Sequence, residues 1–199
     1  MTTGWRARIG TIHPYPSGIR EMGVATPPGV EFIFANLGKG PGLKIEDVEF
    51  MTSQVERATR ELIMQPESPP AVRPGGLQLI MPSVLPVAIL GGKKGEKEII
   101  ELIKGIAQLP ATTAAPAMVE ALKRLNVKRV AVFSPYYRQE LNEKLREYLL
   151  SYGFDILELS STMDNLEVLA GAPDSFYRQV RDLAAKVHEA EGFLIAGGA

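Results

Sequence analysis

The 199-residue chain contains no cysteine and only two histidines, His13 and His188. Without cysteine there can be no disulfide, no thiolate metal site and no cysteine nucleophile. Two histidines are too few for a histidine metal cage, and His188 falls near the end of an expected helix, where an imidazolium complements the helix dipole. We therefore predict no bound metal.

The chain also lacks an excess of charge of either sign. It carries 22 lysines and arginines against 23 aspartates and glutamates, a net charge of −1. This balance gives no electrostatic footprint for nucleic acid or an anionic membrane surface. No apolar run approaches the roughly 18 residues of a membrane helix, and the N-terminus lacks the pattern of a signal peptide. We expect a cytoplasmic protein that binds neither nucleic acid nor membrane.

What the sequence does contain is a regular alternation of two patterns. Short apolar runs typical of buried strands occur at residues 9–12, 30–34, 77–81, 130–133, 154–159 and 193–195. Helical periodicities lie between them, at 45–62, 99–106, 118–125, 141–152 and 176–187. Gly153 and Asn126 follow two of these helices as expected C-caps. Strands that alternate with helices indicate an α/β protein with a mostly parallel sheet.

One segment occurs twice. "RIGTIHPY" (8–15) and "RVAVFSPY" (129–136) share an arginine, an apolar run, a polar residue and then Pro-Tyr. The repeat predicts two similar α/β lobes, which we place at residues 1–110 and 111–199.

Ligands of open α/β sheets bind beyond the carboxyl ends of the strands. The segments at these ends are "HPYPSG" from His13, "PSVLP" from Pro82, "SPYY" from Ser134 and "AGGA" from Ala196. The alternative is ordinary turn chemistry, in which proline ends a strand and tyrosine packs on its rim. The pattern alone leaves both open.

Three further segments have structural interpretations. "MQPESPPAVRPGG" (64–76) is expected to form a long surface loop or lid. "GGKKGEKE" (91–98) lacks the order of a phosphate loop and is predicted to be a flexible connector with solvated charges. Thr112 and Thr113 precede a helix and are predicted to cap it. The alternative is that they line the predicted ligand site.

Three stretches carry a family resemblance: "IGTIHPYPSG" (9–18), "LPATTAAPAMVEALKRLNVKRVAVFSPYYRQELNEKL" (109–145) and "EGFLIAGG" (191–198). In order and spacing they resemble the arylmalonate decarboxylase and maleate isomerase branch of the aspartate/glutamate racemase superfamily. The resemblance implies two similar α/β lobes, each a mostly parallel sheet flanked by helices, with a cleft between them. It also implies cofactor-independent chemistry at a carbon next to a carboxylate.

The resemblance places a carboxylate-binding tyrosine hydroxyl at Tyr136, with Ser134 before the intervening proline. One extra residue between Tyr136 and Asn142 makes Tyr137 the competing candidate. Ser83 matches a family position with a small hydroxyl residue that donates to the same oxygens. A strand-end serine that bonds to its own backbone is the alternative for it.

Other candidates depart from the family pattern. Val84 is apolar at a position where the decarboxylases are expected to carry a second hydroxyl. Pro82 stands near the position of the first family cysteine, and Gly197 stands near the position of the second. Pro14 and Tyr15 line the same predicted site. The missing thiols argue against a cysteine-dependent racemase, because neither glycine nor proline can carry a proton.

His13 is the side chain in the predicted cleft that could exchange a proton near neutral pH. The resemblance carries no role over to it, so a general acid or base function rests on its chemistry and its strand-end position. The alternative is a histidine packed at a strand end with a backbone partner.

Two functional hypotheses follow. The first is a lyase- or isomerase-like protein that binds a small mono- or dicarboxylate and acts at its α-carbon without cysteine. The second is a catalytically inactive family member that serves as a carboxylate-binding or assembly protein, and a homo-oligomer is left open. Family members continue beyond the equivalent of "AGG" with a segment that completes the first lobe. The resemblance therefore implies a first lobe that lacks its C-terminal completion, and we expect either a short member or a lost C-terminal segment.

Overall fold

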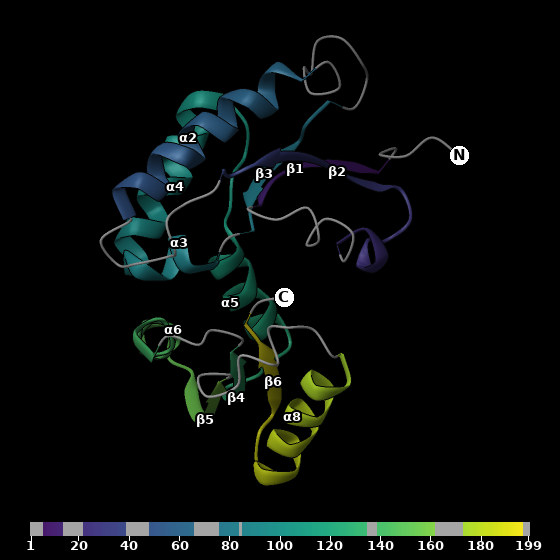
Figure 1. Ribbon diagram of the computed structural model, residues 1–199, viewed down its shortest axis with the longest axis vertical. Coiled ribbons are helices and arrows are strands. Elements are labelled where there is room, and N and C mark those ends of the chain that lie inside the picture. Colours follow the sequence, from purple (N-terminus) through teal and green to yellow (C-terminus); the bar gives the residue numbers. More distant parts are fainter. Residues whose placement is uncertain are drawn as a thin grey trace. The chain divides into compact units, whose positions relative to one another are not determined.

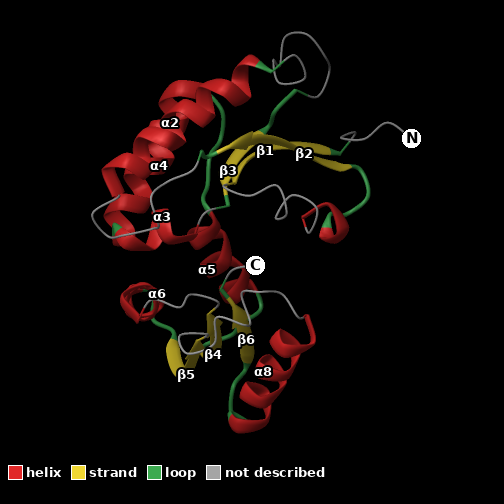
Figure 2. Cartoon of the chain, in the orientation of Figure 1, coloured by secondary structure: helices red, strands yellow, loops and turns green. Residues whose placement is uncertain are grey.

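The computed structural model describes residues 6–13, 22–38, 48–65, 76–83, 85–134, 139–161 and 173–196. The chain divides into two compact units, Met1–Pro116 and Ala117–Ala199. Each unit holds a three-stranded parallel sheet with helices packed against it (Figures 1 and 2). The predicted fold class, two similar α/β lobes with mostly parallel sheets, is confirmed.

In the first unit the strands are ordered β2-β1-β3, so the first strand of the chain is central. The strands are β1 (Ala7–His13), β2 (Val30–Asn36) and β3 (Leu79–Pro82). Its helices include α2 (Val48–Met64), α3 (Leu85–Leu90) and α4 (Gly92–Ala107), and α5 (Ala114–Arg124) begins in the first unit and continues into the second. Beyond β3, the N–H of Ile80 donates to Pro110 O at 3.0 Å and the N–H of Thr112 donates to Ile80 O at 3.1 Å. The chain therefore runs beside β3 immediately before α5.

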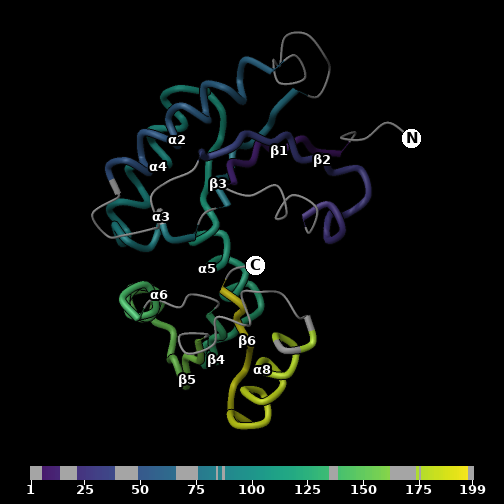
Figure 3. Tube along the Cα trace, viewed as in Figure 1, coloured from purple at the N-terminus to yellow at the C-terminus, as the bar shows by residue number. Residues whose placement is uncertain are grey.

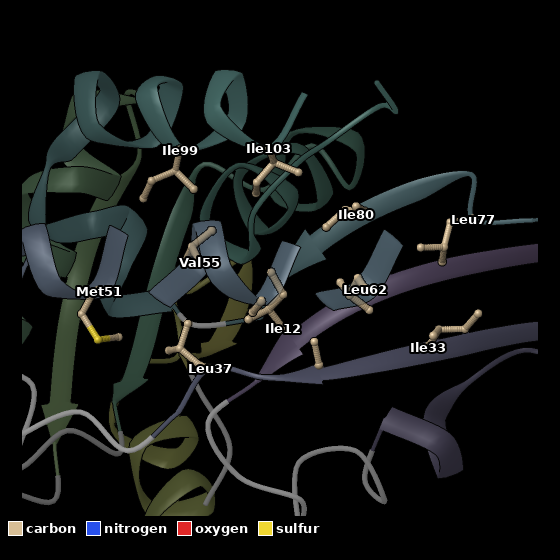
Figure 4. Close-up of a cluster of buried hydrophobic side chains, with 12 residues drawn as sticks. Ile12, Ile33, Leu37, Met51, Val55, Leu62, Leu77, Ile80, Ile99 and Ile103 are labelled. Carbon is tan, nitrogen blue, oxygen red and sulfur yellow. The ribbon is translucent and has the colours of Figure 1, made fainter. Parts of the chain in front are cut away.

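The core of the first unit lies on one face of this sheet. Figure 1 shows α2 and α4 side by side, and Figure 4 shows their apolar side chains meeting those of the strands. Ile12 and Ile80 come from β1 and β3, Val55 from α2, and Ile99 and Ile103 from α4. Because successive strand residues point to opposite faces, Thr11 and His13 of β1 belong to the other face.

The second unit repeats this plan with strand order β5-β4-β6. Its strands are β4 (Arg129–Ser134), β5 (Asp155–Ser161) and β6 (Gly192–Ile195), and its helices are α6 (Gln139–Ser151) and α8 (Pro173–Lys186). Ala131 and Phe133 face α8, where the rings of Phe133 and Phe176 meet edge to face with centroids 4.8 Å apart. Figure 3 follows the backbone of both units along the chain.

Matching hydrogen bonds at the amino ends support the duplication. In the first unit the N–H of Arg8 donates to the Gln78 side chain at 3.2 Å, and the N–H of Gln78 donates to Arg8 O at 3.0 Å. In the second, the N–H of Arg129 donates to the Glu191 carboxylate at 3.0 Å, and the N–H of Glu191 donates to Arg129 O at 2.9 Å. Arg8 and Arg129 thus begin equivalent central strands.

The carboxyl ends match in the same way. The N–H of Ser83 donates to Ile12 O at 3.0 Å, and the N–H of Ala196 donates to Phe133 O at 2.9 Å. Ile12 and Phe133 occupy the same positions of the repeated segment, so the repeat read from the sequence is a structural one.

Within the segment "PSVLP" from Pro82, α3 begins at Leu85, and the proline that follows Leu85 falls in the first helical turn, where proline is tolerated. One local prediction fails. The predicted flexible connector at 91–98 instead opens α4, whose inner face buries Glu96 together with Ile99 and Ile103. The spacing of those three residues is helical, and the charged residues around Glu96 obscured it.

The predicted helix ends are confirmed. Gly153 and Asn126 have positive φ angles of 85° and 56°, as residues that follow a helix often do. In the part of the chain that the structure describes, no helix is both long and apolar enough to cross a bilayer.

Candidate functional site

Ser83 lies at the carboxyl end of β3, directly beside the end of the central strand β1. Its N–H donates to Ile12 O at 3.0 Å and its hydroxyl donates to the same carbonyl at 3.2 Å. The side chain is partly buried. The hydroxyl therefore bonds to the backbone of the neighbouring strand, and not to its own backbone as the alternative interpretation had it.

Thr11, in the middle of β1, is a functional candidate that sequence reasoning missed. It is fully buried, and its hydroxyl donates to Ser83 Oγ at 3.4 Å. A threonine within an apolar run is an ordinary strand residue, and its partner lies 72 positions away along the chain. Only the β1-β3 pairing brings the two hydroxyls together.

His13 ends β1 two residues after Thr11, on the same face of the strand. It is partly buried, and its carbonyl accepts a hydrogen bond from the N–H of Leu37 at 3.1 Å. Because Thr11 bonds to Ser83, the structure brings His13 and Ser83 to the same face and the same end of the sheet. An imidazole and a hydroxyl at one sheet end can move a proton and bind an oxyanion.

In the second unit, Ser134 ends β4 and is fully buried. Its hydroxyl donates to Asn142 Oδ1 at 2.5 Å, and Asn142, in the first turn of α6, is only 6% exposed. This bond joins the end of the central strand to the start of the next helix. The hydroxyl hydrogen of Ser134 is therefore engaged by protein, and its predicted contact with substrate stays a prediction.

The other predicted site residues lie outside the described residues, so their roles also stay predictions. They are Pro14, Tyr15, Val84, Tyr136, Tyr137 and Gly197. The predicted loop or lid at 64–76 likewise falls mostly outside the described part of the chain.

The predicted capping of α5 by the Thr113 hydroxyl is wrong. Thr113 immediately precedes the helix and is 2% exposed, but its hydroxyl has no hydrogen-bond partner within the described part of the chain. An N-cap hydroxyl usually accepts from the N–H of the second or third helical residue. The third residue here is Pro116, which has no N–H.

The amino end of the second sheet holds a strongly perturbed carboxylate, Glu191. It accepts hydrogen bonds from the N–H groups of Arg129 at 3.0 Å and Lys128 at 2.8 Å, and from Nε of Arg129 at 3.1 Å. These bonds, led by that from the Arg129 backbone, lower the pKa of Glu191 to about 2. Ligands bind at the opposite end of such sheets, so we assign this cluster a structural role. Among the described residues, no group of three or more acidic or histidine side chains could hold a metal ion.

Fold and site together define an α/β protein of two duplicated parallel units, with hydroxyl and imidazole groups at the carboxyl end of the first sheet. A sequence model of the family described as arylmalonate decarboxylase matches residues 80–199, more than half of the chain. The chain belongs to this family.

Individual relatives agree with that assignment. The maleate isomerase of Nocardia farcinica is 30% identical over 76% of this chain. The chain spans 66% of the length of that relative.

Solved structures show the same fold. A Nocardia farcinica maleate cis-trans isomerase with a covalently bound succinylcysteine intermediate is 25% identical, with a TM-score of 0.71 over 94% of this chain and 76% of that one. An unliganded arylmalonate decarboxylase is 21% identical, with a TM-score of 0.73 over 96% of this chain and 78% of that one. Because this chain has no cysteine, a succinylcysteine cannot form on it.

Proposed function

We propose that this protein binds a small carboxylate at the carboxyl ends of its parallel strands and acts at the carbon next to that carboxylate without a thiol. The observation that carries the proposal is the hydroxyl of Ser83 at the end of β3, joined to Thr11 on the face that also holds His13. Family membership supports it, because the relatives are named for reactions of malonates and maleate.

A carboxylate needs several converging donors, because burying the charge without them is costly. Ser83 supplies one hydroxyl at the sheet end. His13, on the same face of the first sheet, is proposed to supply a second donor. Tyr136 of the second unit stays the carboxylate donor that the family resemblance predicts. Neutral hydroxyls suit this task because they stabilise an anion without changing their own charge.

The chemical step is proposed to use His13 as the proton carrier. In a decarboxylation, the bond between the α-carbon and one carboxylate breaks and carbon dioxide leaves. The electron pair stays on the remaining fragment as an enediolate, and the α-carbon then takes a proton from the imidazolium. Hydroxyl donors at the enediolate oxygens lower the energy of this intermediate.

Binding is tested by calorimetric titration with sodium malonate. We expect Ser83→Ala and Tyr136→Phe each to weaken the dissociation constant about ten-fold, the value of one hydrogen bond to a charged group. Tyr152→Phe is the matched control, since Tyr152 follows α6 and packs on Tyr148. Equal affinities in wild type and Ser83→Ala would remove Ser83 from the site.

The α-carbon step is tested by incubating malonate with the protein in D₂O and following the formation of acetate with deuterium in its methyl group by proton NMR. We expect this product to form above the protein-free rate, and a loss of about 10²-fold or more in His13→Gln, as is usual for a positioned acid or base. Product formation at an unchanged rate in that variant would exclude His13 as the proton carrier.

A further inference from the structure

The hydroxyl of Thr11 is buried, and a buried hydroxyl without a hydrogen-bond partner is costly. Thr11 is 0% exposed in the middle of the central strand, and the hydrogen bond that its side chain donates goes to Ser83 Oγ at 3.4 Å. A valine would fill the same space without this requirement. The hydroxyl therefore introduces a polar interaction that packing alone does not need.

Ser83 is held loosely from both sides. The two bonds of its hydroxyl, from Thr11 at 3.4 Å and to Ile12 O at 3.2 Å, are longer than the 2.5–3.0 Å usual for hydroxyl donors. Ile12 O also accepts the N–H of Ser83 at 3.0 Å. If the hydroxyl turns away, this carbonyl therefore keeps a donor.

We propose that Thr11 is a positioning residue that presents the Ser83 hydroxyl to a bound carboxylate, an inference that rests on the proposed function. A carboxylate oxygen accepts a hydroxyl proton more strongly than a neutral carbonyl does, so the O–H of Ser83 turns from Ile12 O to the ligand. Thr11 continues to donate to Ser83 Oγ during this turn. Thr11 thereby fixes Ser83 Oγ in place. Because the two hydroxyls form a hydrogen-bonded chain, the bond from Thr11 also strengthens the bond from the Ser83 hydroxyl to the ligand.

The variants Thr11→Val and Thr11→Ser separate this role from packing. Valine keeps the branched shape and removes the hydroxyl, whereas serine keeps the hydroxyl and removes a methyl group. We expect Thr11→Val to weaken the dissociation constant for sodium malonate about five-fold, the value of one ordinary hydrogen bond. We expect Thr11→Ser to stay within about two-fold of wild type.

A double variant shows whether Thr11 acts through Ser83. If it does, Thr11→Val in a Ser83→Ala background weakens binding no further than Ser83→Ala alone, since coupled residues are not additive. An undiminished five-fold effect in that background, or wild-type affinity in Thr11→Val, would overturn the proposal.

The same titrations separate this inference from the proposed function. Weakened binding in Ser83→Ala with unchanged binding in Thr11→Val refutes only the role of Thr11. Malonate affinity that is unaffected by Ser83→Ala, or no binding to wild type at all, refutes both.

Discussion

Replacing Thr113 by valine should stabilise the protein. The Thr113 side chain is 2% exposed, and its hydroxyl has no hydrogen-bond partner among the described residues. A buried hydroxyl that has lost its bonds to water costs about 1–3 kcal/mol. Valine has nearly the same shape, and no cap to α5 is lost, because the hydroxyl bonds to none of the described N–H groups of that helix. We expect the free energy of unfolding to rise by about 1 kcal/mol, which corresponds to a melting temperature about 2–4 °C higher.

Thr59 provides the matched control for this prediction. It is also fully buried, but its hydroxyl donates to Val55 O at 2.7 Å. Thr59→Val loses a made hydrogen bond, so we expect it to be neutral or to cost up to about 1 kcal/mol. Urea unfolding followed by circular dichroism measures both variants. If Thr113→Val is destabilised as much as Thr59→Val, the Thr113 hydroxyl has a partner and our explanation of its burial is wrong.

Three other predictions concern the second unit and the chemistry. Because the pKa of Glu191 is lowered from 4.5 to about 2, its ionised form stabilises the fold above about pH 4.5, and this stabilisation is lost as the pH falls through 2. The stability advantage of wild type over Glu191→Gln should therefore shrink between pH 5 and pH 2 in urea titrations, and a constant difference would contradict the assignment. Asn142→Ala removes the acceptor of the buried Ser134 hydroxyl and should cost about 1–3 kcal/mol, whereas a neutral result would mean that their bond is unimportant. Maleate should isomerise only at trace rates, because the chain has no thiol, and rapid isomerisation followed by NMR would refute this.

The strands were predictable because burial on both faces leaves a plain signal. Val130, Val132 and Phe133 belong to a continuous apolar run, which is typical of a parallel strand that is buried on both faces. All three are buried in β4. The repeat of the two central strands was visible for the same reason. Charge obscured the start of α4, where buried Glu96 looked like part of a solvated segment.

The site was less predictable, because it depends on contacts between distant positions. Ser83 could be proposed from its place after a strand, but Thr11 becomes a candidate only once β3 is known to pair with β1. Thr113 is a different case. It cannot cap α5 through the third helical residue because that residue, Pro116, is a proline without an N–H, and the sequence alone shows this proline. A search for N-caps should therefore check that the third helical residue has an N–H to offer.

The location of carboxylate binding is tested most directly by NMR titration of the ¹⁵N-labelled chain with sodium malonate. We expect the amide resonances of Ser83 and His13, at the carboxyl ends of β3 and β1, to shift in a saturable way. Those of Gln78 and Arg8, at the amino ends of the same strands, should stay in place. Saturable shifts confined to the amino ends, or no shifts at Ser83 and His13, would contradict the claim that the carboxyl end of this sheet binds a carboxylate.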